Sequence, residues 1–234
     1  MTQIQKVIKC FAMAFAIFLA VGIVSGIVGT LAVLTGISKN SDKTGEMDGI
    51  TYEEEIDSLE IDLAAVDLKI QNGDAFAVET DSERIVQKQK NGKLIIEENG
   101  KKWFGVEHGG SLLITIPEDT TFKGVEIDAG AGNITIDCAS LHNLDLDMGV
   151  GELNLTAKLT GLCDIDFGVG EADVILLGSE NDYRICLNKG IGKATLEGES
   201  MKNDTYYGDG ANLLEMDGGI GTVTIDFRAE DQSI

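Results

Sequence analysis

Apolar and polar residues alternate along most of the chain beyond residue 56, and the alternation recurs in copies built around a Gly-apolar-Gly triplet. A period of two is typical of a β-strand that buries one face. The pattern therefore predicts a repeated unit of strand, bend and strand. The copies occupy residues 125–137, 144–156, 163–175, 185–197 and 214–226, and residues 59–71 form a degenerate copy in which the glycines are replaced.

The alternation changes phase at each glycine triplet. In the second copy Leu144, Leu146 and Met148 precede the glycines, whereas Leu153 and Leu155 follow them one position out of phase. A unit that keeps one face buried across such a slip must bend, and glycine tolerates the backbone that a bend requires. We expect the apolar residue between the glycines to fill the corner from inside. These residues are Ala131, Val150, Val169, Ile191 and Ile220.

One such unit cannot bury its apolar face alone, but units that stack on one another can share a core, as in a β-solenoid. Residues 56–124 alternate less regularly and contain Asn-Gly at 91–92, which is a hairpin signal. We therefore expect an all-β fold, a stacked β-solenoid-like repeat domain preceded by a short β meander. A β-sandwich is the alternative, because short strands with glycine turns also fit that class.

The chain begins with a different pattern, an unbroken run of apolar or small residues at 10–37. The run is longer than the roughly 20 residues that cross a bilayer and longer than the about 7–15 apolar residues of a cleavable signal peptide. It predicts one uncleaved N-terminal transmembrane helix, a signal anchor. Lys6 and Lys9 precede it, so the positive-inside rule places the N-terminus on the inner side of the cell membrane and the C-terminal domain on the outer side.

Gly22 and Gly26 form a GxxxG motif within this run. Small residues at this spacing let two membrane helices pack closely, although they are common in membrane helices in any case, so a homo-oligomer stays an open alternative. The predicted organisation is a cytoplasmic leader at 1–9, the transmembrane anchor at 10–37, a juxtamembrane linker at 38–55, the β-strand repeat domain at 56–227 and a charged tail at 228–234.

The chain is strongly acidic, with 40 Asp and Glu against 18 Lys and Arg and a formal net charge of -22. Such a charge repels nucleic-acid phosphates and anionic headgroups, so we expect no nucleic-acid partner. The charge also has a simpler explanation, since it keeps a β-rich domain soluble. The glycine triplets are not phosphate loops, because each leads into a strand and not into a helix N-terminus.

The acids fall at equivalent positions of the repeats, so stacking would align them in columns. Adjacent columns of carboxylates could bind a cation such as calcium, but the glycine-rich nonapeptide of calcium-binding β-rolls is absent and solvated carboxylates often tolerate such spacing. We expect no other cofactor. One column contains Asp62, Asp128, Asp147, Asp166 and Asp217, with Asn188 in one copy, and the other contains Glu60, Glu126, Asp145, Asp164 and Glu215, with Cys186 in one copy.

The cysteines make no CxxC pair, so neither a zinc site nor a disulfide framework is expected. Cys138 and Cys163 fall on the inward phase of their strands and are predicted core thiols. Cys186 falls on the outward phase and is the better candidate for a reactive or bridging thiol.

Trp103, Phe104, Tyr206 and Tyr207 lie in less regular stretches, where aromatic rings either contact a partner or seal a loop against the core. His108 and His142 stand apart, and no serine or cysteine nucleophile motif surrounds either of them. We therefore expect no catalytic residue.

Three segments in this order resemble a bacterial domain family of unknown function with β-strand repeats, whose members are described as putative adhesins. They are IQNGDAFAVE at 70–79, then NGKLIIEE and SLLITIPEDTTFKGVEI within 91–127, and then the serial Gly-apolar-Gly strands. The resemblance covers about residues 56–227. It implies a stacked β fold, often behind a single membrane anchor, and no established activity.

Together these features predict a membrane-anchored, extracytoplasmic β-repeat module that is not an enzyme and binds a protein or glycan of the cell envelope. Adhesion and envelope-stress signalling would both suit such a module. A structural scaffold that self-assembles through sheet edges or the GxxxG helix is the alternative. A glycan-active enzyme is a third hypothesis, which repetition of the acidic pairs argues against.

Overall fold

The computed structural model describes residues 47–99 and 110–229, and these residues are almost entirely β-strand. The early strands are β1 (Asp48–Thr51), β2 (Ser58–Ala65), β3 (Asp67–Gly73), β4 (Ala77–Thr80), β5 (Ile85–Lys90), β6 (Lys93–Glu98) and β7 (Ser111–Pro117). The later strands are β8 (Gly124–Ala131), β9 (Ile134–His142), β10 (Leu144–Thr160), β11 (Leu162–Leu177), β12 (Tyr183–Leu196), β13 (Glu199–Ser200), β14 (Tyr206–Tyr207) and β15 (Asn212–Arg228). A short 3-10 turn, η1 (Glu180–Asp182), precedes β12. The predicted all-β class is confirmed.

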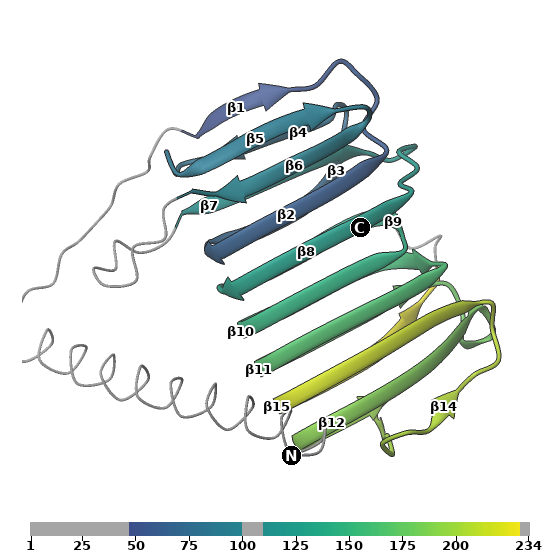
Figure 1. The fold of residues 1–234 in the computed structure, drawn as a ribbon. Coiled ribbons are helices and arrows are strands. Elements are labelled where there is room, and N and C mark those ends of the chain that lie inside the picture. The colour runs from purple at the N-terminus through teal and green to yellow at the C-terminus, as the bar shows by residue number, and fades with distance from the viewer. Residues whose placement is uncertain (1–46, 100–109, 230–234) are drawn as a thin grey trace, which may run out of the picture. The chain divides into compact units, whose positions relative to one another are not determined.

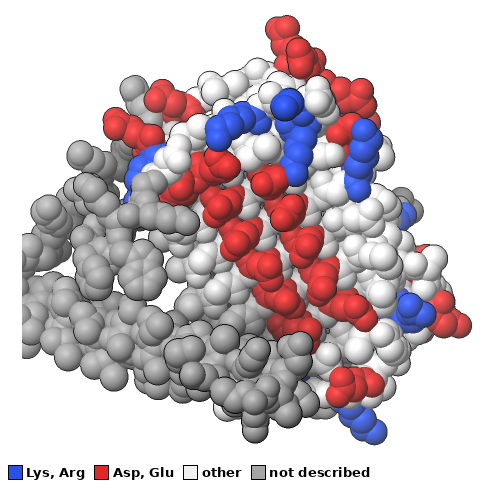
Figure 2. Space-filling model, in the orientation of Figure 1, with Lys and Arg blue, Asp and Glu red and all other residues white. Residues whose placement is uncertain are grey.

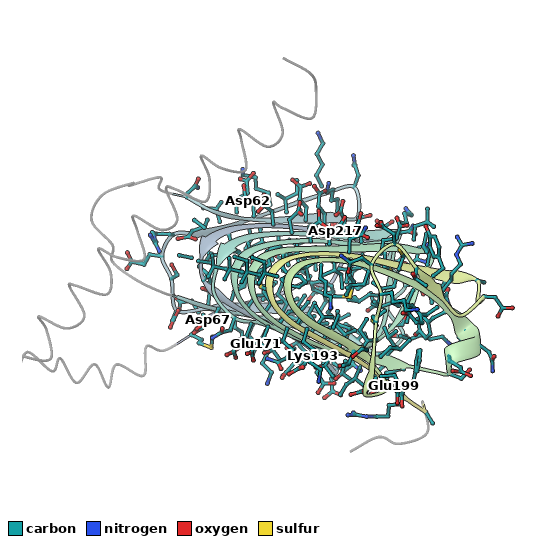
Figure 3. The ribbon with its side chains drawn as sticks, turned by 90° about the horizontal axis from the view of Figure 1, so that it is seen from below. Asp62, Asp67, Glu171, Lys193, Glu199 and Asp217 are labelled. Carbon is teal, nitrogen blue, oxygen red and sulfur yellow. The ribbon has the colours of Figure 1, made fainter. Side chains whose placement is uncertain are left out.

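The strands form one hydrogen-bonded sheet of 15 strands that bends so that its two halves face each other across the core (Figures 1 and 3). We call the half that contains β2, β8 and the first parts of β10, β11, β15 and β12 the first layer. The half that contains β3, β9 and the second parts of the same long strands is the second layer. Each long strand thus passes through a corner and contributes to both layers.

Equivalent positions of the repeats pair side by side in parallel register, as the sequence predicts. Asp147 of β10 pairs with Asp128 of β8 on one side and with Asp166 of β11 on the other. Asp166 in turn pairs with Asp217 of β15. The stack therefore converts each sequence position of the repeat into a straight row of side chains.

The order of the units differs from a simple winding of one unit on the next. At the C-terminal end β15 lies between β11 and β12, so the last unit of the chain is not the outermost one. At the other end β6 and β7 pair in parallel outside β2 and β3, although they follow them in sequence. The alternation does not predict this order, because equal registers let a unit pair with any other unit.

The Asn-Gly hairpin is confirmed. Asn91 and Gly92 have φ of 53 and 78 degrees and connect the antiparallel strands β5 and β6. Positive φ at both central residues is characteristic of a type I′ turn, whose twist matches that of the two strands it joins. Strands β1, β4 and β5 are antiparallel to their neighbours and finish this end of the stack.

The glycines sit at the corners because neighbouring corners touch. Gly151 has φ of 153 degrees, and a Cβ there would lie 1.8 Å from the carbonyl oxygen of Gly132. The apolar residues between the glycines do not fill the corner from inside, which corrects the prediction. The chain reverses around them, so four are only half-buried and Ile191 is 72% exposed. Those four are Ala131, Val150, Val169 and Ile220.

The core contains the alternating apolar residues and two of the cysteines. Cys138 and Cys163 are buried as predicted, and burial raises the pKa of the Cys138 thiol to about 12. Cys186 is buried as well, against the prediction of an exposed thiol. Tyr206 pairs with Cys186 from one side, and its hydroxyl reaches Glu215 on the other side at 3.0 Å. The tyrosine ring therefore covers a cysteine whose position in the alternation points outward.

Within the described residues no helix is both long and apolar enough to span a membrane. The predicted leader and transmembrane anchor lie outside the described residues, as do Cys10, Trp103, Phe104 and His108. Strand β1 falls inside the segment predicted as a linker at 38–55 and corrects its end. Its alternation is too short to recognise, and its pairing with β4 becomes visible only in three dimensions.

Candidate functional site

Two rows of carboxylates cross the outward side of the first layer, which we call the acidic face (Figure 2). They arise because alternate residues of each strand point outward and equivalent strands pair in register. The first row consists of Glu97, Asp62, Asp128, Asp147, Asp166 and Asp217 and ends at Asn188. The second consists of Glu60, Glu126, Asp145, Asp164 and Glu215 and ends at Cys186. Both predicted columns are thus brought together.

The carboxylates of the acidic face repel one another. Burial and the neighbouring charges, those of Asp164 and Asp217 foremost, raise the pKa of Asp166 to about 6. Burial also raises the pKa of Asp164 and of Asp128. Neighbouring carboxylates add to both shifts, those of Asp62 and Asp147 in the case of Asp128. The centre of the face therefore favours a bound proton or a cationic group more than an isolated surface carboxylate does.

Cations of the chain itself occupy one end of the acidic face. Lys93 forms an ion pair with Glu60, and Lys88 forms one with Glu97 at 2.6 Å. The ion pairs of the described residues include none to the carboxylates that β8, β10 and β11 add to the rows. The two lysines show how ammonium groups fit against the rows.

The second layer presents a different surface. Asp67, Glu171 and Lys193 point outward from it, on the opposite side from Asp62 and Asp217 (Figure 3). The row through Glu171 mixes acids with Asn133, Thr222 and Lys193. Because charges of both signs and neutral residues alternate there, the continuous negative surface is confined to the first layer.

A metal centre is not apparent in the geometry. Among the described residues, no three histidine, cysteine, aspartate or glutamate side chains converge as ligands of one ion. Calcium takes six to eight oxygen ligands arranged around one ion. The carboxylates of the two rows are instead spread across the surface of the sheet. The calcium hypothesis for Asp128, Asp147, Asp166 and Asp217 gains no support and stays a prediction.

The remaining candidates have structural partners. Tyr206 is 54% exposed, lies 5.2 Å from the Arg184 guanidinium and covers Cys186. The Tyr207 hydroxyl accepts a hydrogen bond from the Lys202 amide at 2.8 Å.

His142 lies 3.0 Å from the Thr160 hydroxyl because the two residues pair across neighbouring strands. The same hydroxyl also donates to the Leu141 carbonyl at 3.2 Å, so structural contacts surround the histidine.

The structure contains a cavity that the sequence did not predict. It measures about 430 Å³ and lies where the loops before β2 and after β3 and β7 meet. Tyr52 and Phe76 form part of its wall, packed edge to face with centroids 6.0 Å apart. The three consecutive glutamates 53–55 also line it. Only the tertiary fold brings these loops together, so no sequence signal marks the cavity.

The fold resembles solved bacterial structures. A putative cell adhesion protein from Clostridium sporogenes superposes with a TM-score of 0.56 at 18% identity, over 78% of this chain and all of that one. A putative adhesin from Bacteroides fragilis aligns over 77% of this chain and 97% of its own, at 12% identity and a TM-score of 0.32. No protein-family model matches the chain, and no curated protein does. The resemblance inferred from the sequence is confirmed at the level of the fold.

Proposed function

We propose that the chain is a non-enzymatic binding module, held outside the cell membrane by its N-terminal segment, whose acidic face binds a basic protein surface in the cell envelope. In architecture it is a β-solenoid-like stack with an interrupted order of units. The observation that carries the proposal is the pair of continuous carboxylate rows on the first layer. The similar structure from Clostridium sporogenes is described as a putative cell adhesion protein, which agrees with a binding role.

The energetics favour a cationic partner over solvent. Neighbouring strands are about 4.8 Å apart, so each carboxylate stands close to two others of its row. Two like charges at that distance repel by roughly 1 kcal/mol even at the dielectric constant of water. A partner that inserts lysine or arginine side chains between the rows removes this repulsion and adds charge-assisted hydrogen bonds. Lys93 and Lys88 already do this within the chain.

The broad, flat face fits binding better than catalysis. A catalytic pair of carboxylates needs one irregular pair in a cleft with separated pKa values. Here the same acid recurs at the same position along the stack. A surface of this kind attracts partners over a distance and recognises them through many weak contacts.

A titration with a ten-residue lysine peptide tests the acidic face. The full-length chain in detergent should bind the peptide, and affinity should fall about tenfold between 50 and 200 mM salt, because surface ion pairs are screened. Asp147→Asn together with Asp166→Asn should weaken binding several-fold. Asp173→Asn together with Asp226→Asn removes the same charge from the second layer and serves as the matched control.

Equal losses in the two double variants would contradict the proposal, since net charge alone would then explain binding. Chemical cross-linking in intact cell envelopes would next identify the natural partner. A cross-linked protein with a basic surface would support the proposal. Recovery of a glycan in place of a protein would replace the proposed partner class and keep the binding role.

A further inference from the structure

Strand β1 is the open edge of the stack. It pairs with β4 on one side, and within the described residues no strand pairs with its other side. It is the outermost strand at this end in Figure 1. An unpaired edge presents backbone N–H and C=O groups to any strand that can join it.

The other edges are protected. β5, the edge of the first layer at the same end, carries Lys88 and Lys90, and edge lysines discourage pairing. At the opposite end β14 covers Cys186 and Ile185 of β12, and β13 covers Thr195 and Leu196. β1 has neither kind of protection, since its sequence is Asp-Gly-Ile-Thr.

Ile50 makes this edge apolar. It pairs with the fully buried Val78 and therefore faces the core side of the second layer. At this end the first layer finishes with β6 and β5, whereas the second layer finishes with β7, β4 and β1. The second layer therefore has one strand more than the first. Ile50 is 51% exposed, and Met47, which directly precedes β1, is 39% exposed.

The hydrogen bonds show which groups are free at the edge. The Tyr52 amide donates to the Phe76 carbonyl at 2.8 Å, so this pair is a hydrogen-bonded pair of the antiparallel ladder. Such pairs alternate with pairs whose N–H and C=O groups point away from the partner strand. Gly49 and Thr51 therefore direct their backbone groups outward, while Ile50 directs its groups toward β4.

These positions are self-complementary. We propose that two copies of the chain form a closed dimer in which their β1 strands pair antiparallel around a twofold axis at Ile50. In this register Gly49 of each copy is opposite Thr51 of the other, so the outward backbone groups meet. The two Ile50 side chains then form a non-hydrogen-bonded pair, in which opposite Cα atoms are only about 4.5 Å apart and side chains lie close.

The dimer closes on itself. An isologous contact consumes the same edge in both copies and leaves no second open edge, so it ends at two copies and forms no filament. Pairing of such short strands buries far less than the roughly 1,200 Å² of a stable interface. Confinement in one membrane would raise the effective concentration and favour the dimer. The proposal does not depend on the acidic face.

Cysteine cross-linking in isolated membranes tests the register. Ile50→Cys, in a full-length chain that also carries Cys10→Ala, should give a disulfide-linked dimer when copper phenanthroline is added, because the Cα separation suits a disulfide. Asp48→Cys is the matched control on the same strand. The two copies of that residue would be roughly 13 Å apart along the strands, too far for a bridge.

Adding Thr51→Pro to Ile50→Cys removes an outward N–H that β4 does not use, so the cross-link should be lost while the melting temperature stays the same. A chain with Ile50→Cys that remains monomeric would overturn the proposal. So would equal cross-linking of the Asp48→Cys variant, persistence of the dimer with Thr51→Pro, or a disulfide to a different protein.

Discussion

Asp166 stands at the centre of the acidic face, between carboxylates of β10 and β15. Its pKa is raised to about 6, so between about pH 4 and 6 the folded chain holds a proton there that the unfolded chain has lost. The contribution of Asp166 to the free energy of unfolding then falls as the pH rises through this range. We expect a higher melting temperature at pH 5 than at pH 7.5, measured by circular dichroism.

Asp166→Asn should raise the melting temperature at pH 7.5 and flatten its dependence on pH. After allowance for solvent screening the gain is about 1 kcal/mol, or roughly 2–4 °C for a domain of this size. Asp173→Asn on the second layer is the control. An unchanged pH dependence in the Asp166 variant would show that burial and the neighbouring carboxylates do not raise the pKa of Asp166.

Gly151 and Gly198 separate two reasons why a position requires glycine, which are close contact with a neighbouring backbone and positive φ. Both have positive φ, 153 and 78 degrees. A Cβ at Gly151 would lie 1.8 Å from a backbone oxygen, whereas a Cβ at Gly198 would meet nothing within 4 Å. Gly151→Ala should therefore cost on the order of 3 kcal/mol or more and Gly198→Ala only about 1 kcal/mol. Urea unfolding measures both, and equal costs would mean that the corners do not touch.

At the level of elements, alternation and spacing predicted much of the fold. The inward and outward residues, the hairpin at Asn91 and the two acidic rows follow from a period of two and a repeated register. Cys186 shows the limit of the same rule. Its phase is outward as predicted, but Tyr206 comes from a segment with no periodicity and covers it.

The order of the units could not be predicted for a physical reason. Each repeat offers its neighbours the same hydrogen-bond register, so β11 can accept β12 or β15 equally well by pattern alone. The choice depends on the connection between them, which includes the pairing of β13 and β14 with β12. The exposed corner residues, such as Ile191, were missed because a bend changes which way a side chain points.

The internal position of β15 makes a truncation informative. A chain that ends at residue 211 loses Leu214 and Ile225 from the core and leaves β11 and β12 each unpaired on the side that β15 occupied. We expect loss of cooperative thermal unfolding and aggregation through the exposed edges. A chain that ends at Arg228 retains β15 and should melt like the full-length protein. A cooperative transition in the shorter chain would mean that β12 can stack directly on β11.

At the scale of the whole molecule, the predicted membrane topology would decide whether the acidic face meets partners outside the cell. Residues 10–37 and the lysines before them predict that the domain lies outside. The natural cysteines of the described residues suit such a test, because all are buried and burial raises the pKa of each thiol. They should react slowly with a membrane-impermeant maleimide, so an introduced cysteine can be read against a low background.

We predict that Asp173→Cys, on the exposed side of the second layer, reacts with the maleimide in intact cells whose outer layers admit the reagent. Lys6→Cys in the leader should react only after the membrane is permeabilised. Both variants carry Cys10→Ala. Reaction of the leader cysteine alone in intact cells would invert the topology, and a basic envelope partner could not then reach the acidic face. Reaction of Asp173→Cys alone would place the domain outside the membrane. The carboxylate rows could then bind a basic protein of the cell envelope, as proposed.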